Sequence, residues 1–194
     1  MKKILLALAL PLSLMGAAQA ADANTGALRP VLSVGVTYGG DTLATAKYTD
    51  GSSVNIRAGS GLDMKGGVEY RVAPQVSLQA TVGYHVHFTP EASNGDANFN
   101  RIPIELLAFY HINEQWRVGG GVRFVRNARL SGSGAAANLN GNYGNTTGGV
   151  LAVEYMGAKN WGVSFRLVNE KYTLENSNAS FSGNHAGLFA SYYF

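Results

Sequence analysis

The thirteen residues VSLQATVGYHVHF, at positions 76–88, alternate without a break between apolar side chains and small or polar ones. In this segment the even-numbered positions, which we call its apolar parity, carry Val76, Leu78, Ala80, Val82, Tyr84, Val86 and Phe88. The odd-numbered positions, the other parity, carry Ser77, Gln79, Thr81, Gly83, His85 and His87. Successive side chains of a β-strand point to opposite faces, so alternation with period two predicts a strand. One face of this strand therefore meets an apolar environment and the other does not.

The same alternation returns in seven further segments, whereas apolar residues at helical spacing are scarce. The segments cover residues 32–38, 66–70, 102–110, 116–124, 149–155, 161–167 and 186–194, and the pattern is weakest in 66–70. We therefore predict an all-β protein with eight strands.

The connections between the predicted strands alternate in length. Short connections cover residues 71–75, 112–115 and 156–160, and long polar stretches cover 39–61, 89–98, 127–147 and 173–183. Short turns at one end and long loops at the other are typical of an outer-membrane barrel. The pattern predicts an antiparallel up-and-down barrel, or meander. In the first long stretch, the turn signal at residues 48–53 predicts a projecting hairpin.

Two environments would accept the apolar faces: the core of a soluble secreted sandwich or barrel, and the hydrocarbon of a membrane. A soluble fold should carry many Lys, Glu, Thr and Asn residues on the opposite faces, which instead carry mainly Gly, Ser and Ala. Small residues suit the crowded interior of an eight-stranded barrel. The composition of the two faces therefore favours a transmembrane barrel.

Aromatic residues on the apolar parity gather at two levels, as the two interfaces of a bilayer would select. Near the long-loop end they are Tyr38, Tyr84, Phe88 and Phe124. The predicted aromatic girdle at the short-turn end consists of Tyr70, Tyr110, Trp116, Tyr155, Trp161 and Phe194.

The chain begins MKKILLALALPLSLMGAAQA, which has the three parts of a cleavable secretory signal peptide. Lys2 and Lys3 are positive, an apolar run follows, and a small-x-small cleavage site ends at Ala20. We predict a signal peptide at residues 1–20 and a barrel domain at residues 21–194.

Composition excludes several classes of function. Without Lys2 and Lys3, the fifteen Lys and Arg residues fall to thirteen against twelve Asp and Glu, which leaves a net charge of +1 and no basic patch for nucleic acid. The chain has no cysteine, so a disulfide framework and a thiolate metal site are impossible.

The signal peptide, the eight alternating segments and the ending Leu188-x-Ala190-x-Tyr192-x-Phe194 resemble the small eight-stranded outer-membrane barrels of the OmpA/OmpX-like superfamily. The resemblance implies an integral protein of the outer membrane of a Gram-negative bacterium. It also implies that the barrel-assembly machinery reads the C-terminal strand as an assembly signal, through Leu188, Ala190, Tyr192 and Phe194. We expect a monomer.

Charged residues lie on the parity that would face the lumen, and we expect them to form a charge network. Five are basic and four acidic: Lys65, Glu69, Arg101, Glu105, Arg117, Arg123, Glu154, Arg166 and Glu170. A lone buried charge costs several kcal/mol, so these residues should pair. Glu105 should face Arg123, and Arg117 should face Glu154, on neighbouring strands. Both a salt-bridged plug and a gated pore whose pairs switch partners fit this pattern.

The histidines offer two chemical hypotheses. His85 and His87 share the lumen side of one strand and could chelate a metal, with His185 as a candidate third ligand; a plain polar lining is the alternative. Glu170 and His185 fall at comparable depth, which predicts a hydrogen bond. Some barrels of this kind modify lipid A through a His-x-Ser motif, but here the nearest substitute is His87-Phe88-Thr89. We expect no enzyme activity, cofactor or bound metal.

The role predicted from these features is structural or surface-interactive, with long loops outside and a lumen plugged by salt bridges. A narrow channel for small solutes is the alternative, followed by a lipid A-modifying enzyme. The expected surroundings are outer-membrane lipids and lipopolysaccharide. Arg126, Arg129 and Lys171, near the outer rim, would contact lipopolysaccharide phosphates or remain solvated.

Overall fold

The structure is a computed structural model that describes residues 26–47, 53–88, 96–157, 160–175, 177 and 179–194. The predicted signal peptide and the start of the predicted barrel domain lie outside these residues. No helix in the described part of the chain is long and apolar enough to cross a membrane.

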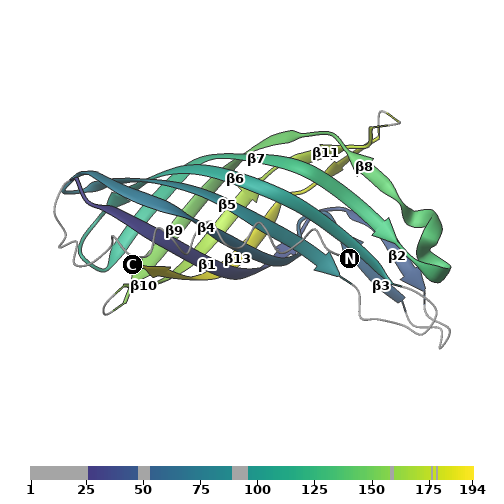
Figure 1. Cartoon of the computed structure of the whole chain (residues 1–194), viewed down its shortest axis with the longest axis horizontal. Helices are drawn as coiled ribbons and strands as arrows, with labels where there is room; N and C mark the ends of the chain where they lie inside the picture. Colours follow the sequence, from purple (N-terminus) through teal and green to yellow (C-terminus); the bar gives the residue numbers. More distant parts are fainter. Residues whose placement is uncertain (1–25, 48–52, 89–95, 158–159, 176, 178) are drawn as a thin grey trace, which may run out of the picture.

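In the described residues, eight long strands form a closed antiparallel barrel, as predicted (Figure 1). Each strand pairs with the next one along the chain, and β1 pairs with β13 to close the cylinder. The weak segment at 66–70 belongs to a full-length strand. The barrel strands are β1 (Leu28–Gly39), β4 (Gly61–Ala73), β5 (Val76–Phe88), β6 (Ala97–His111), β7 (Trp116–Gly132), β9 (Thr146–Met156), β10 (Trp161–Asn169) and β13 (His185–Tyr193).

The outer wall of the barrel is apolar. Val82 is 55% exposed and Leu106 is 50% exposed, although both lie in the middle of long paired strands. The residues that precede them on their strands, Thr81 and Glu105, point the other way and are buried inside the barrel. Water would penalise such a wall by about 25 cal/mol for each Å² of apolar surface, so hydrocarbon is the environment that it fits. The apolar faces do not converge on a common core, and the soluble alternative is therefore wrong.

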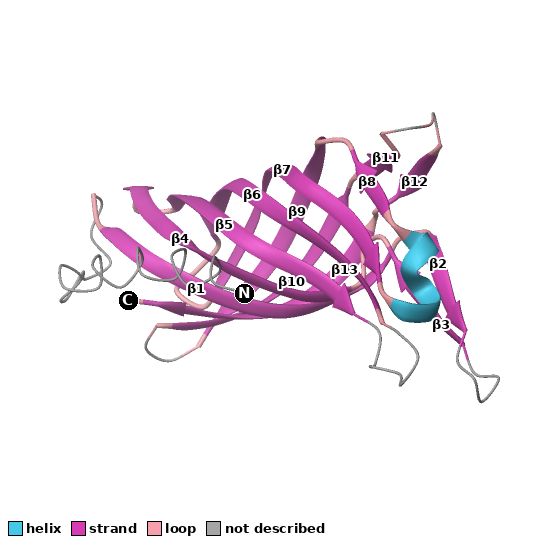
Figure 2. Ribbon diagram, turned by 45° about the vertical axis from the view of Figure 1, so that its right-hand side comes forward, coloured by secondary structure: helices cyan, strands magenta, loops and turns pink. Residues whose placement is uncertain are grey.

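Smaller elements extend the barrel at the long-loop end, opposite the C-terminus (Figure 2). β2 (Thr42–Lys47) and β3 (Ser53–Arg57) form the predicted projecting hairpin, although its turn lies outside the described residues. β8 (Gly141–Tyr143) pairs with the end of β7, and β11 (Lys171–Thr173) pairs with β12 (Ser180–Ser182). A short 3-10 helix, η2 (Gly134–Leu139), lies between β7 and β8.

A β-bulge near the end of β7 reverses which residues face inward. Asn100 pairs with Arg129 and Ile102 pairs with Arg126. An advance of three residues along β7 therefore lies opposite an advance of two residues along β6. Asn127, within the bulge, has a φ of 51°, in the left-handed region that asparagine tolerates better than most residues. Strict alternation from Arg123 would point Arg129 into the lumen, but the bulge turns it to the exposed outer side.

The reversed segment helps to build an apolar core inside the long-loop end, which we call the apolar cap. Ala128 and Leu130 point into this core because of the bulge. The sequence predicts only polar loops with little apolar surface here, so that expectation was wrong. The apolar cap consists of Ile56, Ala58, Ala97, Phe99, Val125, Ala128, Leu130, Tyr143 and Tyr172.

The lumen is also less polar than its predicted Gly, Ser and Ala lining. Leu107 and Phe109 on β6 form a second buried cluster with Val150, Ala152 and Val168. Gly119 makes room for it: a Cβ at this position would lie 2.4 Å from Cδ1 of Phe109. Large inward side chains thus alternate with glycines, as a narrow eight-stranded barrel requires.

Candidate functional site

The lumen charge network is the candidate site. All nine predicted residues are buried inside the barrel, although eight come from five different strands and Glu170 directly follows β10. They form three groups along the axis from the short-turn end to the long-loop end: the inner group around Arg117, the middle group around Glu105, and the outer group of Glu170 and Arg101.

Arg117 is the centre of the inner group. Its Nη2 and Nε atoms lie 2.9 and 3.2 Å from Oε2 of Glu154, which is its direct neighbour across β7 and β9. On the other side, Nη1 donates to Glu69, a residue of the distant strand β4. Tyr193 donates to Oε1 of Glu154 at 2.7 Å, and Arg29 donates to Glu69 at 2.5 Å. The inner group therefore joins strands on opposite walls of the barrel.

Glu105 is the centre of the middle group. Its Oε1 atom accepts from Arg123 Nη1 at 2.6 Å and from Lys65 Nζ at 2.8 Å. Its Oε2 atom accepts from Arg166 Nη1 at 3.0 Å. Three cations on one carboxylate need a second anion nearby, and Asp63 provides it, at 3.3 Å from both Lys65 and Arg123.

Glu170 connects the network to the apolar cap. Its Oε2 atom accepts from Arg123 Nε at 3.0 Å, and its Oε1 atom accepts from the Tyr172 hydroxyl at 2.7 Å. Tyr172 belongs to the cap and is fully buried. Burial raises the pKa of this hydroxyl above its ordinary value, so it remains a donor at physiological pH.

Arg101 stands apart because no carboxylate pairs with it in the described residues. It is fully buried, and its Nη2 atom lies 2.9 Å from Nε2 of His85 and 3.4 Å from the Ser60 carbonyl oxygen. Its Nε and Nη1 atoms have no hydrogen-bond partner there. The guanidinium instead lies 4.7 Å from the centre of the Phe99 ring, a cation–π contact.

The buried charges of the described residues balance. Five acids (Asp63, Glu69, Glu105, Glu154 and Glu170) face five bases (Lys65, Arg101, Arg117, Arg123 and Arg166). A neutral and cross-linked interior has no net field with which to select ions of one sign. The arrangement can hold the walls of the barrel together, and it resists hydration because opening it separates buried pairs.

Asp63, Tyr172 and Tyr193 also belong to the network, although they were not predicted from the sequence. The alternation in β4 begins at Gly61, four residues before the charge that we recognised, so Asp63 could have been found by extending the pattern. The two tyrosines are the inward polar groups that bridge to Glu170 and Glu154. Tyr193 lies on the lumen-facing parity of segment 186–194, opposite the girdle residues, so its inward direction could have been predicted from the alternation. Tyr172 follows segment 161–167 outside the predicted strands, and no pattern there marks it.

The histidines do not share one environment. His85 lies in the lumen between Arg101 and Arg123, whereas Nδ1 of His87 accepts from the Arg57 amide at 3.0 Å. The ring of His185 is 5.5 Å from that of His85. In the described residues, no group of three or more His, Cys, Asp or Glu side chains is placed to hold a metal ion.

The predicted hydrogen bond between Glu170 and His185 was wrong. Nδ1 of His185 lies 3.7 Å from Oε1 of Glu170 but 2.7 Å from the Gly183 carbonyl oxygen. The nearby backbone oxygen is the better-placed acceptor, since hydrogen bonds to nitrogen become weak beyond about 3.2 Å.

The six residues of the predicted girdle lie at the short-turn end. Five of them are exposed on the outer wall, and Phe194 is half-buried. Trp116 packs on Tyr155 with ring centres 5.1 Å apart, and Trp161 packs on Tyr192 at 5.0 Å. Phe194 packs edge-on against Tyr192, and its amide donates to Pro30 of β1 at 3.0 Å. The roles of these residues at the membrane interface and in assembly stay predictions.

Comparisons with known proteins agree on the fold. No family model matches the sequence, and no curated protein matches it. Among solved structures, the chain is similar to Ail, the attachment invasion locus protein of Yersinia pestis, in complex with the heparin analogue sucrose octasulfate. That match has a TM-score of 0.54 and 12% identity, and it covers 88% of this chain and 100% of Ail. Neisserial surface protein A matches with a TM-score of 0.52 and 11% identity over 91% of this chain and 100% of that chain.

The closed barrel, its apolar outer wall and these neighbours together define the class. The chain has the fold of the small eight-stranded outer-membrane barrels, which the sequence pattern predicts, and the outer membrane is its location.

Proposed function

We propose that this protein is a non-conducting barrel that has a structural role in the outer membrane and presents its extensions at the surface. The observation that carries the proposal is the double closure of the lumen. The middle group around Glu105 crosses the interior, and the apolar cap lies beyond it at the long-loop end.

Each closure resists the passage of solutes in its own way. Removing one partner of a buried ion pair costs about 3–5 kcal/mol, and here a single carboxylate serves three cations. The apolar cap offers few polar groups to a hydrated ion, so hydration of this layer is unfavourable. A conducting state would have to open both layers together.

A narrow channel is the second candidate, and Asp63 is the observation that favours it. This carboxylate lies 3.3 Å from both Lys65 and Arg123, which also bind Glu105. It therefore offers an alternative partner during a rearrangement. The apolar cap argues against this candidate, because exchanging partners in the middle group leaves the cap in place.

We also propose that the barrel is not a lipid A-modifying enzyme. The nearest substitute for a catalytic pair is His87 with Thr89, and Thr89 lies outside the described residues. Nδ1 of His87 already accepts from the Arg57 amide. The ring is thus held by the hairpin strand β3, which supports a structural use of this histidine.

A surface role has support from one neighbour. Ail is named as an attachment protein, and its structure holds a heparin analogue. In the chain described here, β2, β3, β8, β11 and β12 project beyond the barrel and supply a surface on which such binding could act.

Planar-bilayer recording tests the proposal. The wild-type barrel should give no discrete conductance steps, and its expression should not change the mass of lipid A. Stable unitary steps in the wild type that change size in Glu105→Gln would establish the channel instead. A mass change in lipid A that requires His87 would establish the enzyme.

A further inference from the structure

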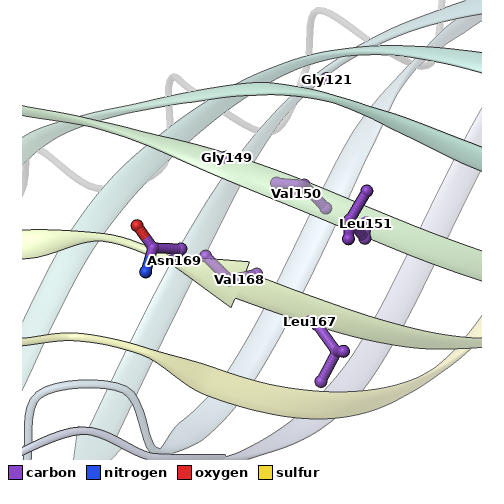
Figure 3. Close-up of a pocket in the computed structure, with 7 residues that line it drawn as sticks. All are labelled: Gly121, Gly149, Val150, Leu151, Leu167, Val168 and Asn169. Carbon is purple, nitrogen blue, oxygen red and sulfur yellow. The ribbon is translucent and has the colours of Figure 1, made fainter.

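A groove lies on the lipid-facing wall of the barrel, over strands β7, β9 and β10 (Figure 3). Its volume is about 420 Å³. Leu151 and Leu167, both exposed and directly paired, form its apolar end toward the short turns, and Asn169 lies beside Gly149 toward the long-loop end. The remaining lining residues are Gly121, Gly149, Val150 and Val168.

The groove exists because two outward residues at the long-loop end of β9, Thr147 and Gly149, are small, whereas the next outward residue is Leu151. Gly149 has no side chain, and a Cβ added there would meet nothing within 4 Å. Thr147, two residues earlier on the strand, is exposed. β9 lies between β7 and β10, and these two strands should be roughly 9–10 Å apart at twice the usual spacing. A trough of this width accepts a single hydrocarbon chain.

Cations stand at the outer end of the same strands. On β7, Phe124 is paired with Thr147, and Arg126 is the next outward residue beyond it. The bulge at Asn127 then keeps Arg129 on the outer side. On the other flank, Lys171 is the outward residue that follows Asn169.

Arg126, Arg129 and Lys171 are all exposed, and in the described residues none of them pairs with a carboxylate. Inside the barrel, four of the five buried cations pair with carboxylates, namely Lys65, Arg117, Arg123 and Arg166. Three exposed cations near the outer end of an apolar trough are available to bind an anion from outside the chain. We call Arg126, Arg129 and Lys171 the cationic rim.

We propose that the groove and the cationic rim together bind one phosphorylated, multiply acylated lipid of the outer leaflet, of the chemical class of lipid A. A phosphate of the headgroup lies between the cations of the rim, and one acyl chain lies in the trough over Gly149. Each part supplies what the other lacks, because the rim attracts any anion and the trough accepts any chain. The proposal needs only a barrel in the outer membrane and is independent of whether the lumen conducts.

Native mass spectrometry of the folded full-length barrel in detergent tests this, with purified bisphosphorylated lipid A as the probe. Phosphatidylcholine with saturated chains and inorganic phosphate, at the same concentration, are the comparison probes. Wild-type barrel should retain lipid A and neither of the others. Replacing Arg126, Arg129 and Lys171 together by Gln should weaken retention about 100-fold, at ~1 kcal/mol for each charge.

A second variant separates the groove from the charges. Gly149→Leu places a side chain in the trough, where its Cβ meets nothing within 4 Å, and leaves the rim intact; it should weaken lipid A retention roughly threefold by displacing chain contacts. Ala80→Leu, on the outer wall of β5, is the matched control and should bind as the wild type does. Heat-modifiability on gels verifies that each variant folds.

Equal retention of phosphatidylcholine and lipid A would overturn the proposal, as would unchanged retention in the triple Gln variant. Equal binding of inorganic phosphate would replace the lipid with a free anion and overturn it too. Wild-type retention in Gly149→Leu would show that the trough holds no chain, and would overturn the two-part site. None of these outcomes bears on conductance, so failure here is distinguishable from failure of the proposed function.

Discussion

Glu105 and Arg123 lie directly opposite each other on β6 and β7, and Nη1 of Arg123 donates to Oε1 of Glu105 at 2.6 Å in a fully buried lumen. The same carboxylate also binds Lys65 and Arg166, so one side chain connects strands from both sides of the barrel. This relationship makes the middle group a structural cross-link, since none of β4, β6, β7 and β10 can move inward or outward without separating charges.

Replacing Glu105 by Gln should therefore destabilise the barrel by about 3–5 kcal/mol, because three buried cations lose their shared anion. The measurement is the midpoint of urea unfolding, followed by the gel shift of the folded barrel. Glu114→Gln, at an exposed turn position, is the control and should leave the midpoint unchanged. A midpoint for Glu105→Gln equal to that of the control would refute the cross-link.

Arg101 should behave in the opposite way from Arg123. Because Arg101 is buried without a carboxylate partner, its replacement by Met removes a desolvation penalty and should leave stability unchanged or raise it. Arg123→Met leaves Glu170 without an Arg or Lys partner in the described residues and removes one of the three cations on Glu105, so it should cost about 3–5 kcal/mol. An equal fall of the unfolding midpoint in the two variants would contradict this prediction, because it would show that Arg101 stabilises the lumen as much as Arg123 does.

Asn127 should tolerate glycine and reject β-branched residues. Its φ of 51° is open to glycine, so Asn127→Gly should be nearly neutral. Asn127→Val should cost about 1–3 kcal/mol, because a β-branched residue is strained in the left-handed region. The unfolding midpoints of the two variants provide the test. Equal stability of the valine and glycine variants would mean that the bulge is not held by this residue.

The buried hydroxyl of Tyr172 should make the folded protein less stable at alkaline pH. Its buried hydroxyl has a pKa raised above the ordinary value near 10, so the folded protein keeps a proton that the unfolded chain loses. Stability should therefore fall as the pH rises above about 10, because the unfolded state then binds fewer protons than the folded one. In Tyr172→Phe, the slope of unfolding free energy against pH in this range should be shallower. An identical slope would assign the alkaline loss to other groups.

The sequence predicts the barrel well because the alternation of apolar and polar residues follows directly from the lipid on one face of each strand and the lumen on the other. Val82 and Leu106 face outward as their parity requires, and Glu105 meets Arg123 because neighbouring strands have similar offsets from the short turn. Pairing between strands that are distant in the sheet was not predictable in this way. Arg117 reaches Glu69 on β4 across the lumen, and such a contact depends on closure and side-chain length rather than on pattern.

The apolar cap was missed for a more local reason. The bulge at Asn127 adds one residue to the alternation, so Ala128 and Leu130 point inward and Arg129 points outward. Counting parity along β7 without the bulge gives the opposite assignment for all three. Nothing in the residues themselves distinguishes the bulge from a loop, because asparagine is common in both.

The most direct test of the barrel is to measure which side chains of β5 face lipid and which face the lumen. The chain has no cysteine, so single Cys substitutions from Ser77 to Val86 can each carry a nitroxide spin label. In lipid vesicles, collisions with oxygen should be frequent at even-numbered positions such as Val82 and rare at odd-numbered ones such as Thr81, with a period of two. Loss of that period, or the reverse phase with Thr81 exposed to lipid and Val82 shielded, would contradict an apolar wall in hydrocarbon around a closed, charged lumen.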